Sequence, residues 1–468
     1  MHARPNLPLP AWRGEGRGEG PLETNRVPSD RLRSDRASTV VTIAAVALVA
    51  ACAVAFALTS FQQDCAAYWV AGAAWRAGLD PYANNAAAGA RVPWDGSLFR
   101  HSRFLYPPLA AELMRPLAAL PYRAAKLLFT ACAVAAWIAA AALLARGRRV
   151  SAAMLGAGAL FFPLYFHLER GQIDLLLLPL VLAAWRVKHR PALAGALFAA
   201  AGTIKPALLG ALPAIAALGH RRWAAWTIGG AAAALLATVL VSGPALVREY
   251  AGVVLPRAAL YGEGGTDAMA LHERDIDGLS GGGDGDSQAI ASSEGRLSRP
   301  EHIAGGAEPF EGSALIDGRL YRYVVPLFDR PASASLPRLL APESPSWPTS
   351  LLPYLLAAGA MIWAGRRVAR RADGSDDDAQ LALFVAALVA CVVASPTGWV
   401  MGFVWALPLA PLVLRIRAAV TTPPWWLRAV VGAWIVCALP APFAGWPAMA
   451  GVALAVAAGA VAIEWPRA

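Results

Sequence analysis

Long apolar runs, each bounded by charged or turn residues, dominate the chain. Val40–Leu58 is nineteen residues long without a charge, enough to cross a hydrocarbon core of about 30 Å as an α-helix. Comparable runs follow it, and the pattern predicts about twelve spans, at 38–60, 122–145, 151–167, 172–186, 191–204, 206–219, 223–242, 350–365, 379–395, 399–414, 426–443 and 446–463. The chain is therefore expected to be an all-α integral membrane protein, and a soluble enzyme is excluded.

The connections between these runs predict the domain organisation. Residues 1–37 are polar and are expected to form a disordered cytoplasmic tail or to reflect a start assigned too far upstream. A transmembrane module covers 38–242, and its first outer loop, 61–121, contains amphipathic pieces that suit helices on the membrane surface. Residues 350–468 form the C-terminal transmembrane helices.

The segment 243–349 is expected to be a long extracytoplasmic loop. It carries fifteen of the thirty-one acidic residues and a glycine-rich centre, Gly278–Asp286. Loops of this length are usually functional lids or disordered. We expect a lid with a mobile centre, whose flank Arg319–Leu327 packs on the membrane surface.

Composition supports the membrane assignment: 57% of residues are hydrophobic and 15% are charged, against roughly 45–50% and 25% in soluble chains. The net charge of +10 does not indicate nucleic acid, because the arginines lie between apolar runs and form no basic stripe with interleaved aromatics. The five cysteines lack metal-binding or disulfide spacing. No metal and no cofactor is expected.

The basic residues also predict the orientation. If the N-terminus is cytoplasmic, the inner connections hold fifteen Lys and Arg residues and the short outer connections hold only Arg170 and Lys205. This asymmetry is typical of one orientation and not of its reverse. Thirty-eight arginines against three lysines are typical of a GC-rich bacterial genome, so the expected location is the bacterial plasma (inner) membrane.

Asp64 lies just past the outer end of the first span. A carboxylate at the edge of an apolar cavity can act as a general base. It could equally be the N-cap of an amphipathic helix that starts at Cys65. The two roles are compatible, because a cap also fixes the direction of the carboxylate.

Lys205 precedes Pro206 within apolar sequence, where proline should interrupt the helix. An ionisable group at such depth is a functional candidate, and an ammonium suits a phosphate-bearing lipid. The alternative is that Lys205 extends to the outer headgroups. Asp174, inside the next predicted span after Glu169 and Arg170, needs a partner or a wet cavity.

Five short motifs follow one another at the outer ends of the predicted spans, and together they resemble bacterial glycosyltransferase family 87 of the GT-C superfamily. The resemblance covers about residues 38–415. Its motifs are Asp64 with Tyr68-Trp69 and Gly78-Leu79-Asp80-Pro81-Tyr82, Tyr106-Pro107-Pro108 with Pro116-Leu117, Gly171-Gln172, Lys205-Pro206, and Ser395-Pro396-Thr397-Gly398-Trp399.

The resemblance implies a GT-C-type bundle whose active site lies at the outer membrane face. It implies a polyprenyl-phosphate-linked hexose, mannose-like, as donor, a lipid or glycan acceptor, contact with membrane lipids, and inversion at the anomeric carbon. Asp64 would then be the catalytic base, and Lys205, assisted by Arg170 or Arg103, would bind the donor phosphate. Tyr68, Trp69, Tyr106, Gln172 and Trp399 would line the substrate cavity, although Tyr68, Trp69 and Trp399 could also be interfacial belt aromatics.

The chain departs from the family pattern at one position, and two other functions remain as alternatives. Many relatives have a histidine after the last turn, where this chain has Val400-Met401-Gly402; His272 or His302 could replace it. A secondary transporter or flippase would also have about twelve spans and a broken helix, but it would commonly carry internal repeats, and none is evident. A non-catalytic scaffold for envelope assembly is the other alternative.

The charge asymmetry yields a topological prediction. Every short arginine-rich connection should be cytoplasmic and the 243–349 segment should be outside. A cysteine placed beside Arg148 should resist a membrane-impermeant thiol reagent applied to intact cells. Labelling of that cysteine from outside would contradict the predicted orientation.

Overall fold

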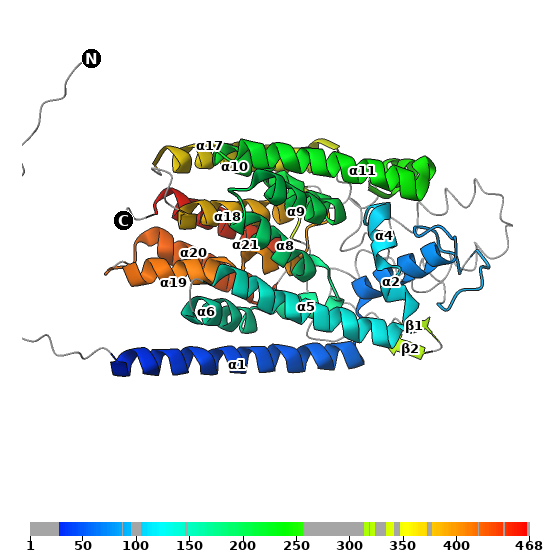
Figure 1. Cartoon of the computed structure of the whole chain (residues 1–468), viewed down its shortest axis with the longest axis horizontal. Helices are drawn as coiled ribbons and strands as arrows, with labels where there is room; N and C mark the ends of the chain where they lie inside the picture. Colours follow the sequence, from blue (N-terminus) through cyan, green and yellow to red (C-terminus); the bar gives the residue numbers. More distant parts are fainter. Residues whose placement is uncertain are drawn as a thin grey trace, which may run out of the picture.

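The computed structural model describes residues 28–86, 88–94, 104–145, 148–255, 313–317, 319–322, 334–340, 347–371, 377–419, 421–442 and 445–465. Most of its helices lie side by side in one bundle, and a smaller group of elements gathers at one end (Figure 1). Arg103, His272, His302 and the glycine-rich Gly278–Asp286 lie outside the described residues, as do residues 1–27 of the N-terminal segment.

The bundle is built from helices whose bounds follow the apolar runs. They are α1 (Pro28–Thr59), α5 (Tyr122–Leu144), α6 (Arg148–Ala159), α7 (Phe162–Arg170), α8 (Asp174–Arg186), α9 (Pro191–Ile204), η2 (Pro206–Ala211), α10 (Leu212–Ala217), α11 (Arg221–Glu249), η3 (Tyr250–Val254), α16 (Leu336–Leu340), α17 (Trp347–Arg371), α18 (Asp377–Ala394), η5 (Val400–Ala406), α19 (Leu409–Ala419), α20 (Trp425–Ala438) and α21 (Trp446–Ile463).

The predicted number of spans is not confirmed. By length and composition, five of the described helices could cross a membrane, or seven if each bent pair counts as one span. Two predicted spans are such pairs, α6 with α7, bent by 72°, and η5 with α19, bent by 43°. Others are short: α8 has 13 residues and α9 and α20 have 14 each. The chain is therefore a helical membrane protein, and its described part holds fewer full-length spanning helices than the apolar runs suggested.

The predicted break at Lys205-Pro206 is confirmed. Helix α9 ends at Ile204 and a 3₁₀ segment starts at Pro206, so the chain is interrupted where the sequence places Lys205 before proline. One boundary differs: helical structure continues past residue 242 to Val254, with a kink at Gly243, whose φ of 80° is not helical.

One end of the bundle holds the arginine-rich connections together. The Lys188 ammonium pairs with Asp377, and the Arg415 guanidinium pairs with Asp378, at the start of α18. His220 lies 3.3 Å from the Gln380 side-chain oxygen. Connections that the sequence assigned to one membrane side therefore meet at one end of the molecule.

The opposite end carries the smaller elements, α2 (Gln63–Arg76), α4 (Pro108–Met114), η1 (Leu117–Ala119) and the strands β1 (Ser313–Ile316) and β2 (Arg319–Arg322) (Figure 1). The strands pair antiparallel, which makes the described fold helical apart from one hairpin. Ile316 forms a bridge with Trp94, and Asp317 donates its N–H to the Pro93 carbonyl at 2.7 Å. The hairpin thus joins the second predicted outer loop to the first.

Polar contacts fix the segment between α1 and α2. The Tyr122 hydroxyl donates to the Phe61 carbonyl at 2.5 Å, and the Lys126 ammonium donates to the Ser60 carbonyl at 2.5 Å. The Gln62 amide donates to Thr130 Oγ1 and to the Leu168 carbonyl, at 3.0 and 2.8 Å. All of these side chains are buried, so helices α5 and α7 determine where α2 begins.

We predict that Tyr122→Phe destabilises the protein by about 1–3 kcal/mol, because a buried carbonyl loses its donor. The check is thermal unfolding of purified protein in detergent. Tyr250→Phe is the matched control, since Tyr250 stacks on Tyr82 and no hydrogen bond of its hydroxyl is seen among the described residues. Equal melting temperatures for both variants would contradict the anchoring role of Tyr122.

Candidate active site

Asp64 lies in the first turn of α2, at the end of the bundle opposite the arginine-rich connections. The helix begins at Gln63 and its N-cap residue is Gln62, with a φ of 51°. The N-cap hypothesis for Asp64 is therefore wrong: the left-handed Gln62 starts the helix earlier than the sequence indicated. Asp64 Oδ2 is buried and has no hydrogen-bond partner among the described residues, so this oxygen is free to accept a proton.

The surroundings of Asp64 bring the pKa of its carboxyl close to 7. Burial raises the pKa of Asp64 from its ordinary value of 3.8 to about 7. The positive charges of Arg170 and Lys205 and the side chain of Gln172 favour the carboxylate and limit this rise, whereas the negative charge of Glu169 adds to it. A carboxyl with a pKa near 7 is suited to general base chemistry at physiological pH.

Gly171 brings the end of α7 against α2. Its φ of +68° ends α7 in the left-handed conformation. A Cβ atom at this position would lie 2.7 Å from Cys65 Cβ, too close for any other residue without movement. The Gly-Gln motif therefore has a physical reason: glycine allows the close approach, and the next residue, Gln172, is placed beside Asp64.

Gln172 also holds two tyrosines. The hydroxyls of Tyr68 and Tyr106 are 2.9 Å apart, and each lies 3.1 Å from Gln172 Oε1. The backbone N–H of Ile173 donates to the same oxygen at 3.2 Å. Three predicted cavity residues, Tyr68, Tyr106 and Gln172, thus form one polar cluster.

Trp69 has a different environment. Its indole N–H donates to the Leu120 carbonyl at 2.9 Å, and its ring packs edge-on against Tyr122 and Trp94. Trp69 is buried and does not line the described cavity. In this structure it packs α2 against α5 and the first outer loop.

Lys205 forms a buried ion pair with Asp174. Its Nζ lies 2.6 Å from both carboxylate oxygens of Asp174. The Trp405 indole N–H donates to Asp174 Oδ1 at 2.8 Å. The partner that Asp174 requires inside an apolar segment is therefore Lys205, and Trp405 is a third member that the sequence did not reveal.

Arg170 is paired as well. Its Nε lies 3.2 Å from Glu169 Oε2, and its guanidinium lies over the Phe166 ring, 5.0 Å from the ring centre. Glu169 in turn accepts a hydrogen bond of 2.7 Å from the Ser60 hydroxyl. The hydrogen bond between Ser60 and Glu169 joins the end of α1 to the end of α7. The positive charge of Arg170 also lowers the pKa of Asp64.

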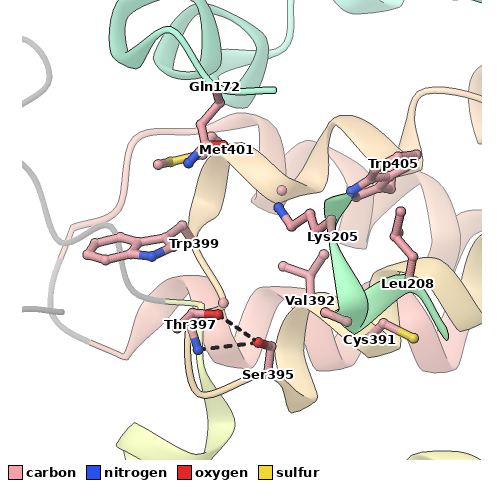
Figure 2. Close-up of a pocket in the computed structure, with 13 residues that line it drawn as sticks. Gln172, Lys205, Leu208, Cys391, Val392, Ser395, Thr397, Trp399, Met401 and Trp405 are labelled. Atoms are coloured by element: carbon pink, nitrogen blue, oxygen red, sulfur yellow. Dashed lines mark hydrogen bonds between the residues drawn. The ribbon is translucent and has the colours of Figure 1, made fainter. Parts of the chain in front are cut away.

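A small pocket, partly open to the outside and called the cavity below, lies next to these groups. Figure 2 shows Gln172, Lys205, Trp399 and Trp405 around it, with the Lys205 ammonium directed into the space. Its lining residues are Gln172, Lys205, Ala207, Leu208, Cys391, Val392, Ser395, Thr397, Gly398, Trp399, Met401, Gly402 and Trp405.

The turn after α18 forms one wall of the cavity. The hydroxyls of Ser395 and Thr397 are 3.0 Å apart, and the Thr397 N–H donates to the Ser395 hydroxyl at 3.3 Å (Figure 2). A Cβ atom at Gly398 would lie 2.0 Å from the Val392 carbonyl oxygen, so only glycine fits there. This geometry places the half-buried Trp399 beside the cavity.

The structure thus brings together most of the predicted site residues: Asp64, Tyr68, Tyr106, Arg170, Gln172, Lys205 and Trp399. Trp69 lies apart from the cavity, and Arg103 is outside the described residues. In the described part of the chain, no three His, Cys, Asp or Glu side chains are grouped so that they could hold a metal ion.

The comparisons with known proteins give one family match. Neither a curated protein nor a solved structure matches the chain. Residues 104–273, however, match the model of glycosyltransferase family 87, and this segment contains Tyr106, Arg170, Gln172, Asp174 and Lys205. Over residues 104–273, the chain is therefore similar to glycosyltransferase family 87, a family of GT-C-type membrane glycosyltransferases.

Proposed function

We propose that this glycosyltransferase moves a hexose, mannose-like, from a polyprenyl phosphate to a hydroxyl of a lipid or glycan acceptor, with inversion at the anomeric carbon. One observation carries the proposal. Asp64 carries a carboxylate oxygen that has no hydrogen-bond partner among the described residues, and Lys205 directs an ammonium into the cavity at the same end of the bundle. Gln172 is next to both, because its side chain bonds to Asp64 and lines the cavity with Lys205.

The donor class follows from the cavity lining. A departing phosphate needs positive charge and hydrogen-bond donors, and an ammonium supplies both as a point charge. The hydroxyls of Ser395 and Thr397 add polar groups, and the Trp399 indole offers an aromatic face to a sugar ring. A lipid-linked donor also fits a site built at the end of apolar helices, because its chain can remain in the bilayer.

The proposed reaction is a single displacement. The acceptor oxygen attacks the anomeric carbon while Asp64 Oδ2 takes the proton of the acceptor hydroxyl. The bond between the anomeric carbon and the phosphate oxygen breaks, and its electron pair leaves with the phosphate, whose charge Lys205 and Arg170 offset. Because attack and departure occur on opposite faces of the sugar, the configuration inverts.

The membrane side is part of the proposal. The arginine-rich connections meet at the end with the Lys188–Asp377 and Arg415–Asp378 pairs, and the candidate site lies at the other end. If the basic end is cytoplasmic, as the charge asymmetry predicts, the reaction takes place at the extracytoplasmic face of a bacterial plasma membrane.

The first test is Asp64→Asn. Asparagine keeps the size of the side chain but cannot take the proton, so glycosyl transfer should fall by roughly 10²-fold or more while expression and donor binding stay normal. The assay uses purified protein, a radiolabelled polyprenyl-phosphate hexose and a bacterial lipid extract.

Asp80→Asn serves as the matched control. Asp80 lies in the same outer segment and uses its Oδ1 to accept the Tyr82 N–H at 2.8 Å, a contact that asparagine can retain. Its variant should transfer sugar normally. Near-normal transfer by the Asp64→Asn protein would eliminate Asp64 as the base.

The second test is the pH dependence of turnover. The base must be deprotonated to act, so activity is lost as the pH falls through the pKa of Asp64, which is about 7. Turnover should therefore rise about tenfold between pH 6 and pH 8 and then level off. A rate that stays flat over this range would show a base with an ordinary carboxyl pKa and would contradict the assignment.

A further inference from the structure

The cation that faces the cavity is not a freely moving side chain. Lys205 follows the last residue of α9, where the negative end of the helix dipole favours a cation. Its long stem would allow the ammonium to reach the headgroup region. The ammonium is instead held at 2.6 Å from both oxygens of Asp174, and its side chain keeps an exposed fraction of 22%.

Asp174 is fixed from three directions. It is the first residue of α8, where the positive end of the helix dipole favours a carboxylate. Lys205 supplies the opposite charge, and the Trp405 indole N–H fixes Oδ1 at 2.8 Å. The carboxylate itself has no exposed surface, so Asp174 does not reach the cavity and acts only through Lys205.

One N–H group of the Lys205 ammonium is not used by Asp174. An ammonium has three N–H groups, and the two oxygens of Asp174 account for two of them. Among the described residues, no further hydrogen-bond partner of Lys205 is seen. Figure 2 shows the ammonium directed into the space beside Trp399, where the third N–H can meet a ligand oxygen.

We infer that Asp174 and Trp405 are positioning residues for Lys205, which hold its ammonium at the cavity so that it binds the phosphate of a prenyl-phosphate donor. The inference rests on the proposed function and adds two residues to it. A pair needed only to neutralise Asp174 would not require the ammonium to line a cavity.

A positioning role for Asp174 predicts a change in phosphate affinity opposite to the change expected from net charge alone. Removing the negative charge of Asp174 increases the net positive charge near the cavity, which by itself would strengthen phosphate binding. If Asp174 positions Lys205, phosphate binding weakens instead, because the ammonium moves away from the cavity. The sign of the effect therefore separates positioning from competition between carboxylate and phosphate.

The experiment measures binding of farnesyl phosphate, with farnesol as the uncharged reference, to the full-length protein in detergent micelles by fluorescence titration. Asp174→Asn should weaken binding of farnesyl phosphate by about tenfold, the effect expected when a charge-assisted contact is lost. Trp405→Phe should weaken it by a smaller factor. In turnover assays, both should raise the KM for the donor more than they lower kcat.

Two controls carry the same kinds of substitution at other places in the fold. Trp137 is also fully buried, but its indole N–H has no hydrogen-bond partner in the described structure, so Trp137→Phe tests loss of packing alone. Asp378→Asn breaks the ion pair with Arg415 at the opposite end of the bundle. Both should bind farnesyl phosphate like the parent protein.

Each outcome has one meaning. Unchanged or tighter binding by Asp174→Asn overturns the inference, and if that variant does not fold, unchanged binding by Trp405→Phe overturns it. Equal binding of farnesyl phosphate and farnesol by the parent protein overturns the proposed donor class and, with it, this inference. Selective weakening in the two site variants, with both controls unchanged, supports it.

Discussion

A charge buried among apolar helices is stable only with a partner of opposite charge, and the Lys205–Asp174 pair meets that constraint at the centre of the site. Removal of Lys205 alone would leave the buried charge of Asp174 uncompensated, which costs roughly 3–5 kcal/mol. The pair joins the start of α8 to the end of α9, and Trp405 extends it to η5. Two members of this group, Lys205 and Trp405, line the cavity.

The other side of the site depends on hydrogen bonds and one glycine. Tyr122, Lys126 and Gln62 fix the chain between α1 and α2, and the missing side chain of Gly171 lets α7 approach α2. These contacts, together with the side chain of Gln172, place Asp64, and among the described residues its Oδ2 has no hydrogen-bond partner. The position of the candidate base is thus a property of the packed helices around it.

The sequence predicted the bounds of several helices well, but it did not predict how many of them are long enough to span a membrane. Hydropathy gives the length of an apolar run, so α5, α9 and α21 were placed within a residue or two. Hydropathy does not reveal a bend inside an apolar run. The bends at α6–α7 and η5–α19 explain part of the difference between the predicted twelve spans and the helices long enough to cross a membrane. The left-handed conformation of Gln62, which makes α2 start early, could not be predicted, because such a conformation is usually signalled by glycine.

At the site, the short motifs identified the residues that carry polar chemistry, because Asp64, Gln172 and Lys205 are unusual within apolar surroundings. Trp405 lies in an apolar 3₁₀ segment with no polar neighbour in sequence, and only the fold shows that its N–H meets Asp174. Trp69 shows the reverse: its motif suggested the cavity, whereas its N–H and ring are used in packing.

The central claim is that Lys205 and Asp64 face one bound donor. It is tested most directly by a cryo-electron-microscopy structure of the protein in lipid nanodiscs with a non-hydrolysable polyprenyl phosphonate sugar. The account predicts the phosphonate within salt-bridge distance of Lys205 Nζ, about 4 Å or less, with the anomeric carbon turned toward Asp64. A phosphonate bound at the opposite end, near Lys188 and Arg415, would contradict it.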